Sequence, residues 1–273
     1  MQRAEKLFKV AVFVLAALPA FSAETENKGL FLFSPLAGRL ASQVTFTVPN
    51  ASAQQLNDTG GLYGMSLLYA EKNFTLGSSA DYSRLDKSYE NNYLFFTRFY
   101  TGKAGELQPS AGLSVENIHI YTQMAAADAA PLSSLDVDSS IWAFHLTAGL
   151  SYKEGAFRIS PFAGYFNEQV GTVVSSPGMI VSGVNKYGFK GVYSDSLNYA
   201  TAGTRLEASI SHFLRVDSTV YFRFGDIGPA LITSRNRIDF LLSREFGLSC
   251  KIDYFQDKYE TNSFVSFGPV FVF

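Results

Sequence analysis

The chain has 273 residues; 47% are hydrophobic, 15% aromatic and 17% charged, and the formal net charge is −2. This apolar content excludes a disordered chain, and a near-neutral charge without a long basic run argues against a nucleic-acid partner. The single cysteine excludes a disulfide framework and a cysteine-rich zinc site. Phe and Tyr are abundant and no long helical pattern follows the first residues, so the composition indicates an all-β protein.

The N-terminus has the features of a targeting segment. Three basic residues precede an apolar core of about eleven residues, Val10 to Ala20, which is too short to span a bilayer. Small residues permit cleavage after Ser22 or after Ala23. We therefore predict a cleaved signal peptide at 1–23 and a mature domain at 24–273. No later run reaches the roughly 18 apolar residues of a transmembrane helix.

The rest of the chain repeats a pattern of period two. In the last segment Phe267, Phe271 and Phe273 share one face, and mostly smaller side chains occupy the other. Such alternation predicts strands with unlike surroundings on their two faces. Each predicted strand is close to the 9–11 residues that a tilted strand needs to cross a bilayer, or somewhat longer. The twelve expected spans are 39–49, 60–70, 73–84, 91–101, 109–122, 140–152, 156–167, 199–213, 218–226, 235–244, 246–256 and 262–273.

Short and long connections alternate between these segments. Tight turns are expected at 71–72, 153–155, 215–217 and 244–245, with longer polar loops between them. Outer-membrane barrels place short turns in the periplasm and long loops outside, which supports the count of twelve. The first strand is the least well defined, because a continuous apolar run at 30–33 precedes it. Ten strands, or eight with long extensions, are the alternatives.

A secretory signal, alternating strands throughout and a terminal strand that ends in Phe273 resemble a Gram-negative outer-membrane β-barrel protein. The resemblance implies an antiparallel up-and-down transmembrane barrel in the bacterial outer membrane, with both termini periplasmic. It also implies contact with outer-membrane lipid and with the barrel-assembly machinery. Phe273, Phe271 and Phe267 would form the assembly signal. The resemblance covers essentially the whole mature chain, identifies no subfamily and leaves the oligomeric state open.

The same period-two alternation places charged side chains on the strand faces that point into the barrel. Both signs occur among them, so we expect ion pairs in a plugged or narrow lumen rather than a charge-selective pore. The predicted lumen-lining residues are Asp81, Arg98, Glu116, His145, Arg158, Arg205, Glu207, Arg223, Arg237, Asp239, Lys251 and Asp253.

The sequence predicts no catalytic site. A hydrolase needs a nucleophile beside a base, and Ser151 shares a strand face with His145 at a separation of roughly 20 Å. His119 lies near an apparent slip in alternation at Glu116-Asn117, which we interpret as a β-bulge. No metal or cofactor motif is present in the sequence.

Residues 167–198 form the longest stretch without clear strands. Loops of more than about 15 residues in a compact fold are usually functional or disordered. Two interpretations remain open for this stretch, an extracellular hairpin extension and a constriction that folds into the lumen.

One hairpin allows a prediction of register. A three-residue connection around Arg244 places Asp239 opposite Lys251 and Arg237 opposite Asp253, with all four side chains inward. Opposite charges favour this pairing by roughly 0.2–1 kcal/mol for each pair. A shift by two residues would place Arg237 opposite Lys251, or Asp239 opposite Asp253.

The leading functional hypothesis is a porin-like channel for small solutes. The alternative is a non-conducting structural or surface-interaction barrel of the adhesin kind, and an outer-membrane enzyme is a more distant third. The first two differ in whether the lumen is open.

Overall fold

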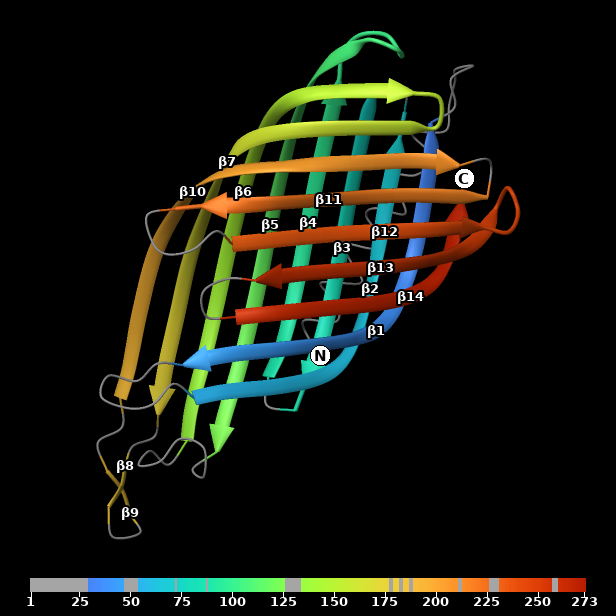
Figure 1. Cartoon of the computed structure of the whole chain (residues 1–273). Coiled ribbons are helices and arrows are strands. Elements are labelled where there is room, and N and C mark those ends of the chain that lie inside the picture. The colour runs from blue at the N-terminus through green and yellow to red at the C-terminus, as the bar shows by residue number, and fades with distance from the viewer. Residues whose placement is uncertain are drawn as a thin grey trace.

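Twelve antiparallel strands close into a barrel, and a separate two-stranded hairpin lies beyond one of its rims (Figure 1). The predicted all-β, twelve-stranded antiparallel barrel is confirmed, and the alternatives with ten and eight strands are wrong. The signal peptide predicted at 1–23 lies outside the described residues. The structure is a computed structural model, and it describes residues 29–46, 54–71, 73–86, 88–125, 134–176, 179–181, 184–186, 189–210, 213–225, 231–256 and 260–273.

Each barrel strand pairs with its neighbours in the chain, β7 pairs with β10 across the inserted hairpin, and β1 closes the ring against β14. Closure lets the strands satisfy each other's backbone groups around the ring. Among the described residues, no helix is long and apolar enough to cross a membrane. The strands are β1 (Leu30–Phe46), β2 (Gln54–Ala70), β3 (Phe74–Leu85), β4 (Ser88–Tyr100), β5 (Leu107–Ala125), β6 (Ser134–Glu154), β7 (Phe157–Ser176), β8 (Met179–Val181), β9 (Val184–Lys186), β10 (Phe189–Ile210), β11 (Leu214–Phe224), β12 (Leu231–Leu241), β13 (Phe246–Gln256) and β14 (Glu260–Val272).

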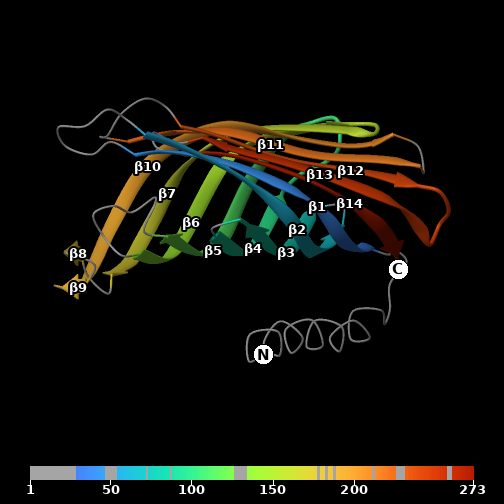
Figure 2. The ribbon, with the colours of Figure 1, turned by 90° about the horizontal axis from the view of Figure 1, so that it is seen from below.

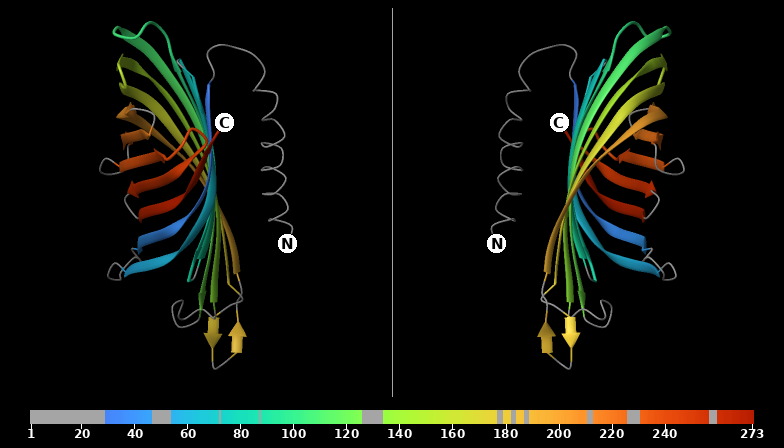
Figure 3. Two further views of the ribbon diagram at one scale, coloured as in Figure 1. Left: turned by 90° about the vertical axis from the view of Figure 1, so that its right-hand side faces the viewer. Right: turned by 90° about the vertical axis from the view of Figure 1, so that its left-hand side faces the viewer.

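The barrel is flattened into two walls whose strands cross each other. Strands β11 to β14 run through one wall and β3 to β6 through the other (Figure 1), and the view from below shows the two walls facing each other (Figure 2). Seen from the sides, β8 and β9 extend away from the barrel instead of entering it (Figure 3). Flattening brings side chains of opposite walls within reach of each other.

Large apolar side chains cover the outside of the barrel. Trp142, Phe240 and Phe267 are 56%, 48% and 59% exposed, whereas the inward Arg223 is 1% exposed. An apolar exterior around a polar, charged interior reverses the arrangement of a water-soluble protein and is typical of barrels that face lipid.

The two described ends of the chain meet at one rim. The Phe273 amide donates to the Phe31 carbonyl at 3.0 Å, and the Val272 amide donates to Glu245 in a neighbouring turn at 2.9 Å. Just inside this rim, Leu32, Leu68 and Val270 form a buried apolar cluster. The short connections lie at the same rim, which we call the inner rim; the opposite end is the outer rim.

Several of the predicted strand boundaries are wrong, including the starts of β2 and β6, which begin at Gln54 and Ser134 rather than at residues 60 and 140. Strand β1 begins at Leu30 rather than at residue 39, because apolar side chains lie on both of its faces there and the period-two contrast is lost. The turn predicted at 215–217 belongs to β11, where Asp217 pairs with Glu207. Most of the predicted loop at 167–198 consists of the outer parts of β7 and β10, with β8 and β9 between them, as in the hairpin-extension interpretation.

The β-bulge predicted at Glu116-Asn117 is also wrong. Glu116 and Asn117 pair in unbroken register with β4 on one side and β6 on the other. The apparent slip arises because Ile118 and Ile120 turn their apolar side chains into the lumen, where they line a cavity.

The predicted register of the β12–β13 hairpin is wrong by two residues. Arg237 lies opposite Lys251, so Asp239 does not oppose Lys251 and Asp253 does not oppose Arg237. The like charges are tolerated because each has another partner. Arg237 bonds Asp239 on its own strand at 2.8 Å, and Lys251 reaches Asp81 on β3 at 2.7 Å.

The connection in this hairpin is longer than predicted. Leu241 pairs with Gly247, which leaves residues 242–246 between them. The Ser243 hydroxyl accepts hydrogen bonds from the amides of Glu245 and Phe246 at 3.2 and 3.0 Å, so a side chain stabilises the wider turn.

Candidate functional site

The lumen contains most of the charged residues that parity directed inward, and ion pairs join its opposite walls. In the first cluster Arg98 on β4 contacts Glu207 on β10 at 3.0 Å and Asp217 on β11 at 2.7 Å. Arg158 contacts the second Glu207 oxygen at 3.2 Å and lies 3.8 Å above the Tyr100 ring. Because β4 is not a neighbour of β10 or β11, these contacts cross the barrel interior.

A second cluster joins another four strands. Arg235 on β12 contacts Glu116 on β5 at 2.5 Å. Lys251 on β13 contacts Asp81 on β3 at 2.7 Å and Asp253 on its own strand at 3.2 Å. Buried charges are stable only when they are paired and hydrogen-bonded, and these contacts supply the pairing.

Nearer the inner rim, Arg237 joins β12 to the first two strands of the chain, β1 and β2. Its Nη1 donates to Ser66 on β2 at 2.9 Å, and its Nη2 donates to Ser34 on β1 at 2.8 Å. Towards the outer rim, Arg223 contacts Glu168 at 3.3 Å, with its guanidinium 4.5 Å from the centre of the Phe255 ring.

Two predicted lumen residues have no ion pair in the part of the chain that the structure describes. His145 is buried, shares a hydrogen bond of 2.9 Å with the Thr201 hydroxyl, and lies 4.8 Å from the Tyr221 ring. Arg205 is buried and donates from Nη2 to the Thr147 hydroxyl at 2.6 Å.

The sequence interpretation missed several members of these clusters. The predicted turn at 215–217 contains Asp217 and the predicted loop at 167–198 contains Glu168, so alternation assigns neither side chain to the lumen. Arg235 lies within the predicted span 235–244 and shares the inward face of Arg237, so the same reasoning would have found it. Tyr100, whose hydroxyl donates to Glu207 at 2.8 Å, ends an aromatic-rich strand and was not distinguished from the lipid-facing rings.

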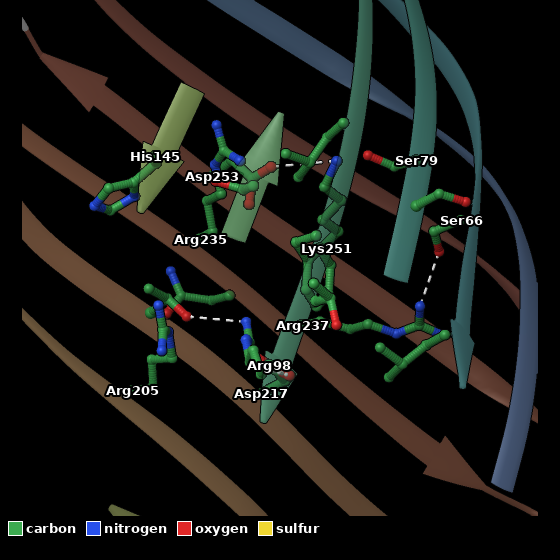
Figure 4. A pocket seen from close by; sticks show the side chains of 18 of the residues that line it. Ser66, Ser79, Arg98, His145, Arg205, Asp217, Arg235, Arg237, Lys251 and Asp253 are labelled. Carbon is green, nitrogen blue, oxygen red and sulfur yellow. Dashed lines mark hydrogen bonds and ion pairs between the residues drawn. The ribbon is translucent and has the colours of Figure 1, made fainter. Parts of the chain in front are cut away.

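Side chains leave small cavities in the lumen, among them an inner and an outer cavity. The inner cavity has a volume of about 120 Å³, and Leu68, Leu113, Arg205 and Arg237 are among the residues that line it (Figure 4). The outer cavity, of about 100 Å³, lies towards the outer rim beside Arg223. Arg235, Lys251 and Asp253 are among the residues that line both cavities, so the second ion-pair cluster stands between them. Within the described ranges, no three His, Cys, Asp or Glu side chains gather as a metal site would require.

Several solved structures share this architecture at low sequence identity. The translocator domain of the autotransporter NalP from Neisseria meningitidis has a TM-score of 0.52 and 12% identity, with 100% of this chain and 98% of that chain covered. The toluene transporter TodX of Pseudomonas putida has a TM-score of 0.40 and 8% identity, with coverages of 94% and 93%. The outer membrane protease OmpT of Escherichia coli has a TM-score of 0.40 and 6% identity, with coverages of 92% and 99%.

At such identities the likeness to the NalP domain shows a shared fold, and the chain has the fold of outer-membrane β-barrels. No protein-family model matches the sequence, and no curated protein matches it.

Proposed function

We propose that the chain is a bacterial outer-membrane barrel that acts at the cell surface through a sheet standing above its outer rim, with a lumen closed by its own side chains. The strand lengths are the main support. Strands β5, β6, β7 and β10 contain 19, 21, 20 and 22 residues, whereas β11, β12 and β13 contain 11 each. Since about 9–11 residues suffice to cross a bilayer, the outer ends of the long strands stand beyond it.

These extensions form one continuous sheet, which we call the outer sheet (residues 121–125, 134–140, 169–176 and 189–198). One of its edges is free. Strand β10 pairs with β7 from Phe189 onward but with β11 only from Ala200 onward, so among the described residues the backbone of 189–198 is paired on one side alone (Figure 1). Val192 and Tyr193 on this edge are 72% and 62% exposed.

A free edge of about ten residues is suited to binding an extended segment of another protein by strand addition. Copies of this chain in the same membrane are poor partners. They all insert in one orientation, and antiparallel pairing of two β10 edges would require one copy to be inverted. The partner is therefore an extended segment of a different surface or extracellular protein.

The closed lumen follows from the ion pairs that cross it. Arg98, Arg235 and Lys251 each join strands of opposite walls, and the remaining cavities are small. We propose no catalytic role. Ser151 has no histidine partner among the described residues; it accepts a hydrogen bond from Ser160 at 2.9 Å.

Labelling of intact cells tests the proposed topology. In a Cys250→Ser background, a membrane-impermeant maleimide should label Val192→Cys on whole cells. Arg244→Cys, in an inner-rim turn, should be labelled only after the outer membrane is permeabilised, because the short turns and both termini are proposed to be periplasmic. Labelling of Arg244→Cys alone on intact cells would invert the orientation and refute the surface role.

The second candidate is the porin-like channel for small solutes, favoured by one observation. The two cavities adjoin through the layer that contains Arg235 and Glu116, so opening that ion pair would join them. Planar bilayers distinguish the candidates. The surface proposal expects no steady conductance from the purified chain. A steady conductance that increases in Glu116→Gln, but not in the rim variant Arg244→Gln, would favour the channel.

A further inference from the structure

We propose that the inner cavity is a binding site for one small monocarboxylate, held by the Arg205 guanidinium. This inference does not depend on the surface role proposed above. It rests on the charge of the cavity, on the unpaired state of Arg205, and on the size and apolar character of the remaining lining.

The two lumen cavities have opposite charge balances. Five basic and two acidic side chains are among the residues that line the inner cavity, whereas three basic and five acidic ones line the outer cavity. Four of the five basic side chains at the inner cavity, Arg98, Arg235, Arg237 and Lys251, are already paired with carboxylates. The charge that remains for an anionic ligand is therefore that of Arg205, the fifth.

Arg205 is the cation that the neighbouring carboxylates leave unpaired. It is 7% exposed, and no carboxylate of the described residues lies within 4.0 Å of it. The two nearest acids along its face, Glu207 and Asp217, are engaged by Arg98 and Arg158. A buried guanidinium without a counter-charge is costly, and a bound anion would remove that cost.

The guanidinium is held in a fixed position. It lies 4.3 Å from the centre of the Phe162 ring, and Nη2 donates to Thr147 at 2.6 Å. Gly112 leaves room for it, because a Cβ at that position would be 2.9 Å from Nη2. Of its donors only Nη2 has a hydrogen-bond partner among the described residues, so Nε and Nη1 remain for a ligand. Figure 4 shows Arg205 among the side chains that line this cavity.

The rest of the lining identifies the ligand class. A planar guanidinium binds carboxylates through paired N–H donors. Leu94, Phe96 and Leu113 give the cavity an apolar side that suits a hydrocarbon group rather than a second charge. A volume of about 120 Å³ is close to the roughly 150 Å³ of an engineered cavity that holds benzene. Short-chain and single-ring monocarboxylates match these limits.

Calorimetric titration with sodium benzoate tests the proposal. The mature chain is purified in detergent, and the heat of benzoate added to detergent alone is subtracted. We expect one saturable site with a dissociation constant of about 1 mM or lower. Arg205→Gln should weaken binding by about 10- to 100-fold because the ion pair is lost. Arg244→Gln, the same change in an exposed turn, should have no effect.

Two further comparisons keep the test decisive if Arg205→Gln folds poorly. Gly112→Ala should displace the guanidinium without removing its charge and weaken binding by several-fold. Benzyl alcohol, a neutral molecule of similar shape, should bind the wild-type chain at least tenfold more weakly than benzoate. Absence of saturable benzoate binding, equal affinity for benzyl alcohol, or unchanged affinity in a folded Arg205→Gln variant would overturn the site.

Discussion

Individual charged side chains in this lumen form ion pairs between opposite walls of the barrel rather than with residues of an adjacent strand. Arg98 and Glu207 are 109 positions apart in the chain, and Lys251 and Asp81 are 170 apart. Alternation predicts that such side chains point inward, because a charge on the lipid face is costly. Alternation does not predict which residues pair, since contact across the lumen depends on how far the barrel is flattened. This is why the candidate site could be predicted as a set of residues but not as a set of pairs.

The first prediction concerns the strongest of these links. Arg98→Gln removes the shared partner of Glu207 and Asp217, and leaves Asp217 without an ion pair among the described residues. We expect a loss of about 3–5 kcal/mol in the free energy of unfolding, the usual cost of leaving a buried charge uncompensated. Urea unfolding in detergent measures it. Arg244→Gln, in an exposed turn, breaks no ion pair of the described residues and serves as the control, so equal losses in the two variants would contradict the role of Arg98.

Glycines at the closing seam support the second prediction. A Cβ at Gly38 on β1 would be 1.9 Å from the Val265 carbonyl oxygen, and a Cβ at Gly268 on β14 would be 1.8 Å from that of Pro35. Both obstacles are backbone, so Gly38→Ala and Gly268→Ala should each destabilise the barrel by about 1–3 kcal/mol. Gly171→Ala in the outer sheet meets its nearest atom at 3.9 Å and should be neutral. Thermal unfolding monitored by gel migration distinguishes these outcomes.

At the scale of elements, the faces of strands could be predicted and their ends and register could not. The alternation of apolar and polar side chains persists wherever one face of a strand meets lipid and the other meets the polar lumen, as along β13 and β14. It fails in β1, where Leu32 enters an internal apolar cluster and Phe31 and Phe33 lie on the opposite face. The β12–β13 register depended on a turn whose length is set by the Ser243 hydroxyl. Cross-strand charge could not decide it, because Arg237 and Lys251 find their partners elsewhere.

The free edge of β10 gives the third prediction. The outer part of β7, residues 167–176, already pairs antiparallel with 189–198 on one side. A synthetic peptide of residues 167–176 should therefore bind the other side as an added strand, detectable by anisotropy of a fluorescent label. Val192→Pro should abolish binding, because proline lacks the amide donor and disfavours a strand interior. Val192→Thr keeps the strand geometry and should preserve it. Equal binding by both variants would exclude strand addition at this edge.

At the scale of the whole molecule, the barrel must reach the membrane and close there, and the last residue takes part in closure. The Phe273 amide donates to Phe31 at 3.0 Å, and the Phe273 carbonyl accepts from Phe31 at 3.4 Å. The Phe273 ring is 72% exposed on the lipid-facing side of the inner rim. The residue therefore contributes backbone hydrogen bonds to the seam and offers an exposed aromatic ring at the chain end. The assembly signal implied by the sequence stays a prediction, and the exposed ring is the feature through which it can be tested.

The fourth prediction separates these two contributions. Phe273→Ala keeps the terminal backbone hydrogen bonds and removes the ring, whereas deletion of Phe273 removes both. If the ring is read by the assembly machinery, Phe273→Ala should lower the amount of folded barrel in cells several-fold, measured by heat-modifiable gel migration of outer-membrane fractions. The same variant refolded from urea into detergent should reach the wild-type yield, because no seam hydrogen bond is lost. A wild-type level in cells for Phe273→Ala, with a reduced level for the deletion, would restrict Phe273 to closing the seam.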